Sequence, residues 1–100
     1  MEISKSDNGG KVLLSISGEI DLDASPNLRK DIVENLNNSK SVDIDLSAVT
    51  YIDSSGVSCL IEGTQLAAKN NLSFIITALS NEVMQVLQLA HLDKILKIQS

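Results

Sequence analysis

Several kinds of residue are scarce in this 100-residue sequence, and each scarcity excludes a class of protein. The single cysteine, Cys59, rules out an internal disulfide, and the single histidine, His91, leaves no cluster of nitrogen and sulfur ligands for a metal. No apolar run is long enough to cross a bilayer, and no signal peptide opens the chain. We therefore expect a cytoplasmic protein that does not insert directly into a membrane.

Basic and aromatic residues are also few. Eight Lys and Arg stand against thirteen Asp and Glu, giving a net charge of −5, and only Tyr51 and Phe74 are aromatic. A nucleic-acid partner requires a basic surface and commonly stacking side chains, so we expect no nucleic acid. Neither a GxxxxGK[ST] nor a GxGxxG pattern occurs, and no other cofactor motif is present.

Apolar periodicity predicts strands that alternate with helices. The stretch DNGG at 7–10 predicts a hairpin, followed by a strand that Gly18 ends. Three helices are expected. The first is capped by Ser25 and ends at about residue 36, and the others cover 55–69 and 80–90. A strand is expected at 42–47. The nearly continuous apolar run at 72–78 predicts a central strand covered on both sides, and 92–98 a final turn or edge strand.

This order predicts the fold class. Strands that alternate with helices give an α/β domain with a mixed four- to five-stranded β-sheet. The polar alternation at 42–47 indicates that the helices pack mainly on one face. We expect one domain over residues 1–100.

The stretch YIDSSGVSCL at 51–60 places a carboxylate and two hydroxyls at the start of a predicted helix. Asp53 suits an N-cap and the positive end of the helix dipole, which is the structural interpretation. Gly56 in the first turn indicates that another surface approaches the backbone closely. The alternative is a regulated serine, because a phosphate at a helix N-terminus meets unpaired NH groups. The residues alone leave both open.

Catalysis by a serine nucleophile has little support in the sequence. No G-x-S-x-G elbow occurs, and His91, the only possible histidine base, follows the third predicted helix, where a basic group favours the dipole. Cys59 is expected to be a small packing residue. We therefore expect that the chain is not an enzyme.

Three segments together resemble a STAS domain of the anti-sigma factor antagonist type. They are GEID at 18–21, VDIDLSAVTYIDSSGVSCL at 42–60 and HLDKILKI at 91–98. The resemblance covers nearly the whole chain and implies a regulator of bacterial transcription that switches partners. Two positions depart from the commonest pattern: Val57-Ser58 follow Gly56, and Ala24 replaces a frequent hydroxyl residue. Both departures concern which partner is recognised.

The resemblance also implies specific residues and partners. An anti-sigma factor that is a serine kinase binds the unphosphorylated protein and phosphorylates the serine after the motif aspartate, here Ser54. A metal-dependent serine phosphatase acts on the phosphorylated form. The implied partner-binding residues are Asp21, Asp23, Asp53, Ser54, Ser55, Gly56 and Val57, of which Gly56 would let the partner approach. The alternative is a STAS subunit of a membrane lipid-transport ABC complex that binds its ATPase constitutively.

Overall fold

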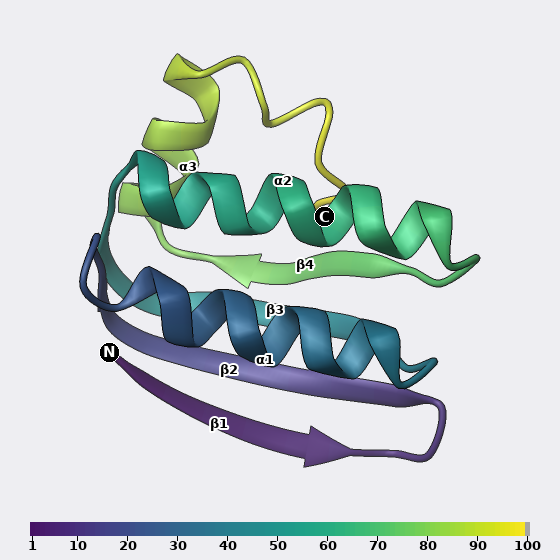
Figure 1. Cartoon of the computed structure of the whole chain (residues 1–100). Coiled ribbons are helices and arrows are strands. Elements are labelled where there is room, and N and C mark those ends of the chain that lie inside the picture. Colours follow the sequence, from purple (N-terminus) through teal and green to yellow (C-terminus); the bar gives the residue numbers. More distant parts are fainter. Residues whose placement is uncertain (100) are drawn as a thin grey trace.

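The computed structural model describes residues 1–99, which form four strands and three helices (Figure 1). In chain order the elements are β1 (Glu2–Asp7), β2 (Lys11–Ile20), α1 (Ser25–Asn37), β3 (Ser41–Ile52), α2 (Ser54–Lys69), β4 (Phe74–Leu79) and α3 (Asn81–Leu89). The predicted order of strands and helices is confirmed. No helix in this range combines the length and apolar character that crossing a membrane demands.

The strands form one mixed sheet in the order β1-β2-β3-β4. β1 and β2 are antiparallel and make the predicted hairpin, in which Gly9 takes a positive φ of 81° and its NH donates to Asp7. β2 with β3, and β3 with β4, are parallel, as crossover helices require. The carboxyl ends of these parallel strands therefore meet at one edge of the sheet.

Gly18 does not end β2, so that part of the prediction is wrong. The strand continues to Ile20, and its register with β3 shifts on either side of Gly18. Gly18 has a φ of 87°, a backbone conformation that glycine adopts without a steric penalty. At both shifts β3 has one residue more than β2, and Gly18 lies on β2 opposite this irregular stretch. β2 continues past the glycine to the edge where β3 also ends.

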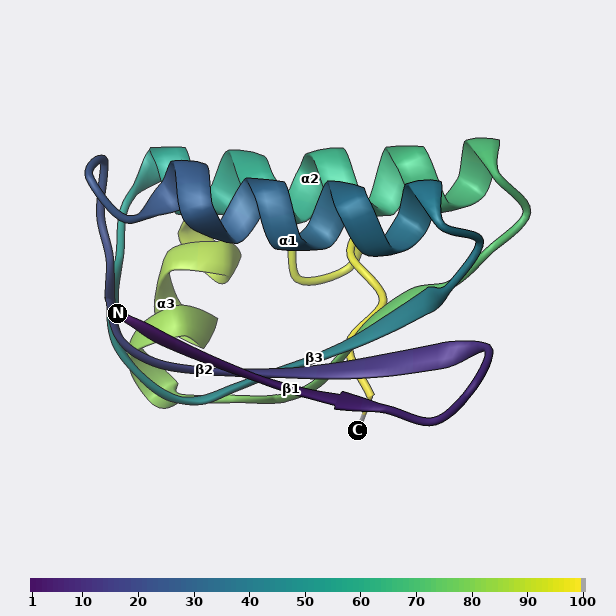
Figure 2. The same cartoon turned by 60° about the horizontal axis from the view of Figure 1, so that its bottom comes forward.

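The helices cover one face of the sheet, which confirms the predicted α/β class (Figure 2). Side chains alternate along β3, where Val42, Ile44 and Leu46 are buried and Asp43 and Asp45 are only half-buried. The helix side of the sheet meets Leu28, Ile32 and Leu36 of α1, spaced as an amphipathic helix requires. α1 and α2 lie side by side over this core.

The prediction of a central strand at 72–78 is wrong. β4 is the last strand in the sheet order, and its side chains alternate between buried and half-buried. The apolar run does not require a second covered face, because Ile75 is only half-buried and lies on the face of the sheet opposite Phe74 and Ile76. Beyond α3 the chain returns to β4 through a single bridge, Ile76 to Ile98, and this takes the place of a further strand.

Candidate functional site

The predicted site lies where β2 and β3 end. Ile20 and Ile52 are register partners, and the NH of Asp53 donates to the carbonyl oxygen of Ile20 at 3.2 Å. The turn that follows β2 and the start of α2 therefore leave the sheet side by side, at the left of Figure 1. The acidic residues Glu19, Asp21 and Asp23 consequently belong to one surface with the serines that follow Asp53.

Asp53 caps α2, as its sequence position indicates. One carboxylate oxygen, Oδ1, accepts the backbone NH of Ser55 at 2.9 Å and that of Gly56 at 3.3 Å. The same oxygen accepts a short hydrogen bond from the Ser55 hydroxyl. These bonds satisfy NH groups that the first turn of a helix leaves without partners. The cap thereby fixes the direction in which α2 leaves the sheet.

The hydrogen bonds around Asp53 change its acidity. The Ser55 hydroxyl is the main cause that lowers the pKa of the Asp53 carboxyl; desolvation opposes it, and the backbone NH groups of Gly56, Ser55 and Leu22 lower the pKa further. Each of these donors favours the charged form of the carboxyl. The two loops of the site are joined at this point by the hydrogen bond from the Asp53 NH to the Ile20 carbonyl oxygen.

Ser54 and Ser55 are placed differently although they are neighbours. Ser54 is the first residue of α2 and is exposed, and no hydrogen bond from its hydroxyl is found among residues 1–99. The Ser55 side chain is half-buried, and its hydroxyl is committed to Asp53. A second exposed serine, Ser58, lies one turn further on and donates to the Ser54 carbonyl oxygen at 2.9 Å. Only Ser54 therefore combines an accessible hydroxyl with a position at the helix start.

The turn between β2 and α1 is closed by Asp21. Its carboxylate accepts the NH of Ala24 at 2.9 Å, and its carbonyl oxygen accepts the NH of Ser25, also at 2.9 Å. The expectation that Ser25 caps α1 is wrong, because Ser25 is the first residue of the helix and its hydroxyl points back to the Leu22 carbonyl oxygen. Asp21 thus has a structural role in this turn, while Asp23 is exposed.

Gly56 is explained by packing inside the domain. A Cβ atom at this position would lie 2.7 Å from the side chains of both Ile20 and Ile52. The close surface that the sequence indicated is therefore the end of β2 and β3, and Gly56 does not leave room for a partner. Val57 is likewise buried, with 8% of its surface exposed. Both residues position the start of α2 from below.

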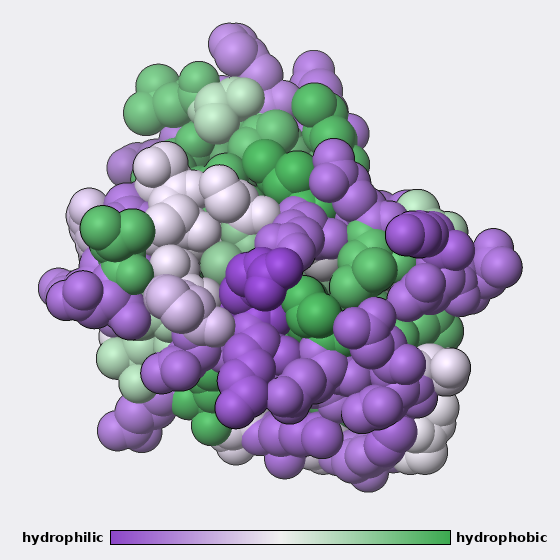
Figure 3. Space-filling model, viewed as in Figure 1, coloured by the Kyte–Doolittle hydropathy of each residue, from purple (hydrophilic) through white to green (hydrophobic). Residues whose placement is uncertain are grey.

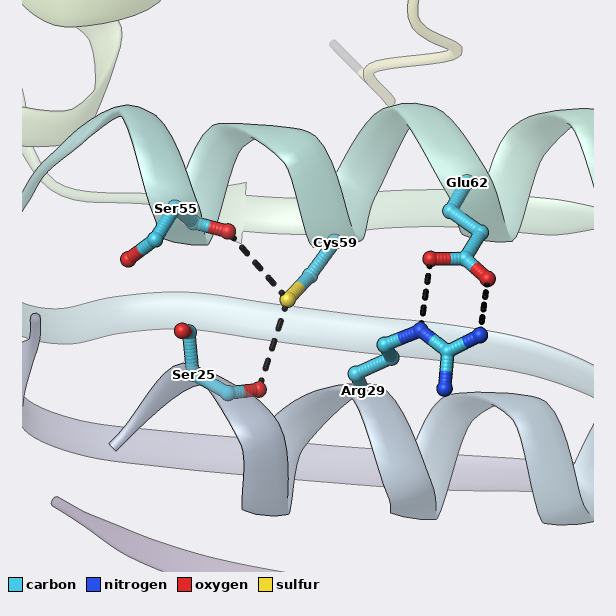
Figure 4. Close-up of polar contacts among 5 residues, drawn as sticks. All are labelled: Ser25, Arg29, Ser55, Cys59 and Glu62. Carbon is cyan, nitrogen blue, oxygen red and sulfur yellow. Dashed lines mark hydrogen bonds and ion pairs between the residues drawn. The ribbon is translucent and has the colours of Figure 1, made fainter. Parts of the chain in front are cut away.

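Two contacts join α1 to α2 beside the site (Figure 4). The buried Cys59 thiol lies 3.4 Å from the carbonyl oxygens of Ser25 and Ser55. One turn further along, Arg29 donates two hydrogen bonds, of 2.8 and 2.7 Å, to the Glu62 carboxylate at the exposed seam of the helices. Cys59 is a packing residue, as expected, and the thiol links the first turns of both helices.

Sequence reasoning missed the exposed apolar side chains at this edge. Leu22 is 72% exposed and Tyr51 is 48% exposed, and Tyr51 is paired in register with Glu19. In Figure 3 the left side, where these loops lie in Figure 1, carries a green apolar projection beside pale side chains of intermediate hydropathy. The segment GEIDLD at 18–23 contained a signal for this exposed leucine. Ile20 is the last residue of β2 and faces the core, so Leu22 lies in the turn, where no strand covers its side chain.

Within residues 1–99 the side chains form no group of three or more His, Cys, Asp or Glu that could hold a metal ion. His91 is exposed and follows the end of α3, where its φ is 59°. It takes the helix-end position that the sequence predicts, on a different element from Ser54.

Comparison with known proteins agrees with this architecture. A family model described as "Mlab, STAS domain" matches residues 3–98. An anti-sigma factor antagonist from Mycobacterium paratuberculosis is 28% identical, with a TM-score of 0.86 over 98% of this chain and 84% of that one. A putative anti-sigma factor antagonist from Thermotoga maritima is 23% identical, with a TM-score of 0.87 over 98% and 86%.

A third solved structure is the Bacillus cell fate determinant SpoIIAA in its phosphorylated form. It is 17% identical, with a TM-score of 0.77 over 99% of this chain and 92% of that one. At this identity the likeness shows the fold.

Proposed function

The chain belongs to the STAS domain family, and we propose that it is an anti-sigma factor antagonist that phosphorylation of Ser54 switches off. The unphosphorylated protein binds an anti-sigma factor that is also a serine kinase, and this binding frees the sigma factor. A metal-dependent serine phosphatase restores the binding form. The cytoplasm, where these partners act, is the proposed location.

The observation that carries this proposal is the difference between the two serines after Asp53. The Ser54 hydroxyl is exposed and uncommitted, whereas the Ser55 hydroxyl is bound to Asp53. A kinase must reach the acceptor oxygen and leave the fold intact. Ser54 meets both conditions, while transfer to Ser55 would remove the hydroxyl bond to Asp53 from the cap of α2.

The position of Ser54 also suits a phosphate once it is attached. The positive end of the α2 dipole favours an anion there. The phosphate adds about −1.5 to −2 charges at neutral pH. The domain is therefore expected to keep its fold in both states, which a reversible switch requires.

Release of the partner follows from the relative size of two effects. An exposed ion pair contributes only about 0–1 kcal/mol, so a cation of the partner would gain little from the new phosphate. Removing water from an ion inside a tight interface costs several kcal/mol. The phosphate would lie beside Asp53 and close to the acidic turn at 19–23, which adds repulsion. Desolvation therefore outweighs attraction, and the complex dissociates.

The proposed contact surface consists of residues from both loops. Asp23 and Ser54 are exposed and touch the partner directly, while Asp21, Asp53 and Ser55 hold the two loops in place. Gly56 and Val57 are buried, so they support the contact surface by packing under the first turn of α2 and do not touch the partner. The chain itself is proposed to be a kinase substrate and not an enzyme.

The test compares three tagged proteins in a pull-down from the source cell: wild type, Ser54→Asp and Ser4→Asp. Ser4 is an exposed serine on the edge strand β1, so its variant carries the same added charge away from the site. We expect a serine kinase of the anti-sigma type to be retained by wild type and Ser4→Asp, and lost by Ser54→Asp. Incubation with that kinase and labelled ATP should place phosphate on Ser54.

Two results would overturn the proposal. A transporter ATPase retained equally by all three proteins would identify a constitutive subunit of a lipid-transport complex. Tighter retention of the kinase by Ser54→Asp would show that the partner recognises negative charge at this position, and the direction of the switch would then be reversed.

A further inference from the structure

Leu22, at the edge of the proposed binding surface, has an exposed side chain that is not part of the hydrophobic core. Leu22 leaves 72% of its surface in water, and the turn that carries it contains no other large apolar side chain that is exposed. An isolated surface leucine needs no explanation by itself. Its setting makes it notable, because the turn is held rigidly and adjoins Ser54.

The backbone on both sides of Leu22 is fixed by hydrogen bonds. Asp21 accepts the NH groups of Ala24 and Ser25 on one side, and the Ile20 carbonyl oxygen accepts the NH of Asp53 on the other. The Leu22 carbonyl oxygen accepts the Ser25 hydroxyl at 3.4 Å. A side chain presented by such a turn loses little backbone freedom on binding, which is the condition for an efficient anchor.

The charges around Leu22 have one sign. Residues 17–25 and 50–58, which build this edge, contain Glu19, Asp21, Asp23 and Asp53 and no Lys or Arg. Glu19 and Asp23 are exposed. A partner that covers this edge is complementary when it offers an apolar recess for the leucine and cationic side chains around it.

From these observations we propose that Leu22 is the apolar anchor of the interface, and that it inserts into an apolar pocket, rimmed by Lys or Arg, on the anti-sigma kinase. This inference rests on the proposed function. It also explains the switch, because the anchor and the Ser54 hydroxyl lie on loops that are joined by the hydrogen bond from the Asp53 NH to the Ile20 carbonyl oxygen. A hydrated phosphate on Ser54 would keep the partner from closing over the leucine.

The experiment measures the affinity of the purified anti-sigma kinase, identified as described above, for immobilised variants of the full chain by biolayer interferometry. Leu22→Ser is compared with Ile95→Ser, which makes the same kind of change at a residue 67% exposed in the segment after α3. We expect Leu22→Ser to weaken binding by about 30-fold or more, as loss of a central anchor does, and Ile95→Ser to change it less than about threefold.

A third variant tests the charged rim. Asp23→Asn should slow association a few-fold at low salt and reduce the dependence of the association rate on salt, with little effect on dissociation. Thermal unfolding followed by circular dichroism should give the same transition for all three variants, because each replaced side chain is exposed.

The outcomes separate this inference from the function it rests on. If Ser54→Asp abolishes binding and Leu22→Ser does not weaken it, the switch stands and the anchor is wrong. Equal losses for Leu22→Ser and Ile95→Ser would show that the contact is not specific to this turn, and would also overturn the inference. If Ser54→Asp binds as wild type does, the proposed function itself fails.

Discussion

Asp53 and Ser55 form a closed pair at the start of α2, in which one carboxylate oxygen accepts both the backbone NH and the hydroxyl of the same serine. The pair leaves Ser54, which lies between the two residues in sequence, outside the hydrogen-bonded unit. A cap and an exposed acceptor are therefore built from three consecutive residues. The structural and the regulatory interpretations of this stretch consequently apply to different serines.

The first prediction concerns the stability of two matched serine variants. Ser54→Ala should change the free energy of unfolding by less than about 0.5 kcal/mol, because it removes an exposed hydroxyl without a partner. Ser55→Ala should destabilise the protein by more than this, since Asp53 loses a donor. Urea unfolding followed by circular dichroism measures both. Equal stability of the two variants would contradict the division of roles between the serines.

The second prediction is a pH dependence that comes from Asp53. Its pKa is lowered in the folded protein, first of all by the Ser55 hydroxyl. The unfolded chain therefore binds its proton at a higher pH than the folded one, and the carboxylate stabilises the fold above the unfolded pKa. That contribution is lost as the pH falls through the lower, folded pKa. Stability should thus decline in acid, below the ordinary range of aspartate.

Ser55→Ala provides the control for this titration. Without the hydroxyl, the Asp53 pKa should move up towards the ordinary value for aspartate, while that of Asp7 should stay low. The pKa of the Asp7 carboxyl is lowered mainly by its hydrogen bond with Lys40, and neither residue belongs to α2. Carboxyl carbon shifts measured by NMR against pH report both groups. An unchanged Asp53 titration in the variant would show that the hydroxyl is not the main cause.

The order of elements and the placement of the cap could be predicted because they depend on local signals. Capping residues and apolar spacing act within one or two turns of chain, and they gave α2 and α3 nearly to the residue. The errors came from features that depend on distant contacts. Gly18 stays inside a strand because β2 pairs with β3 on both sides of it, and β4 is the last strand only through the order of the whole sheet.

The site shows the same division. Neighbouring loops after β2 and β3 followed from parallel strands, and the acidic turn is indeed beside the serines. Gly56 is in close contact with two isoleucines, Ile20 and Ile52, which belong to different strands. The sequence alone therefore could not identify the surface that approaches the glycine. The commitment of the Ser55 hydroxyl to Asp53 depends on a rotamer, which no sequence pattern specifies.

The third prediction tests the packing of Gly56. Gly56→Ala should destabilise the protein by about 1 kcal/mol or more, because the added methyl group lies 2.7 Å from Ile20 and Ile52. The better helix propensity of alanine offsets at most about 1 kcal/mol of this cost. Gly10→Ala is the control, since nothing lies within 4 Å of a Cβ there. A Gly56→Ala variant more stable than wild type would show that the isoleucines repack without strain.

The fourth prediction uses Cys59 to report on the helix pair beside the site. Burial raises the pKa of the Cys59 thiol, with a smaller contribution from Glu62, so less of the reactive thiolate is present near neutral pH. Only 5% of the side chain is exposed, between the first turns of α1 and α2. A disulfide reagent such as Ellman's reagent should therefore react at least about tenfold more slowly with the folded protein than with the chain in urea.

The same reaction distinguishes a local from a global opening. If the thiol reacts only when the whole domain unfolds, the reaction rate should rise in the Gly56→Ala and Ser55→Ala variants by the amount that their loss of stability predicts. If the first turns of α1 and α2 separate on their own, Ser55→Ala should speed the reaction more than its loss of stability accounts for, because it weakens the cap of α2 directly. Fast labelling of the wild-type protein would contradict the buried position of the thiol.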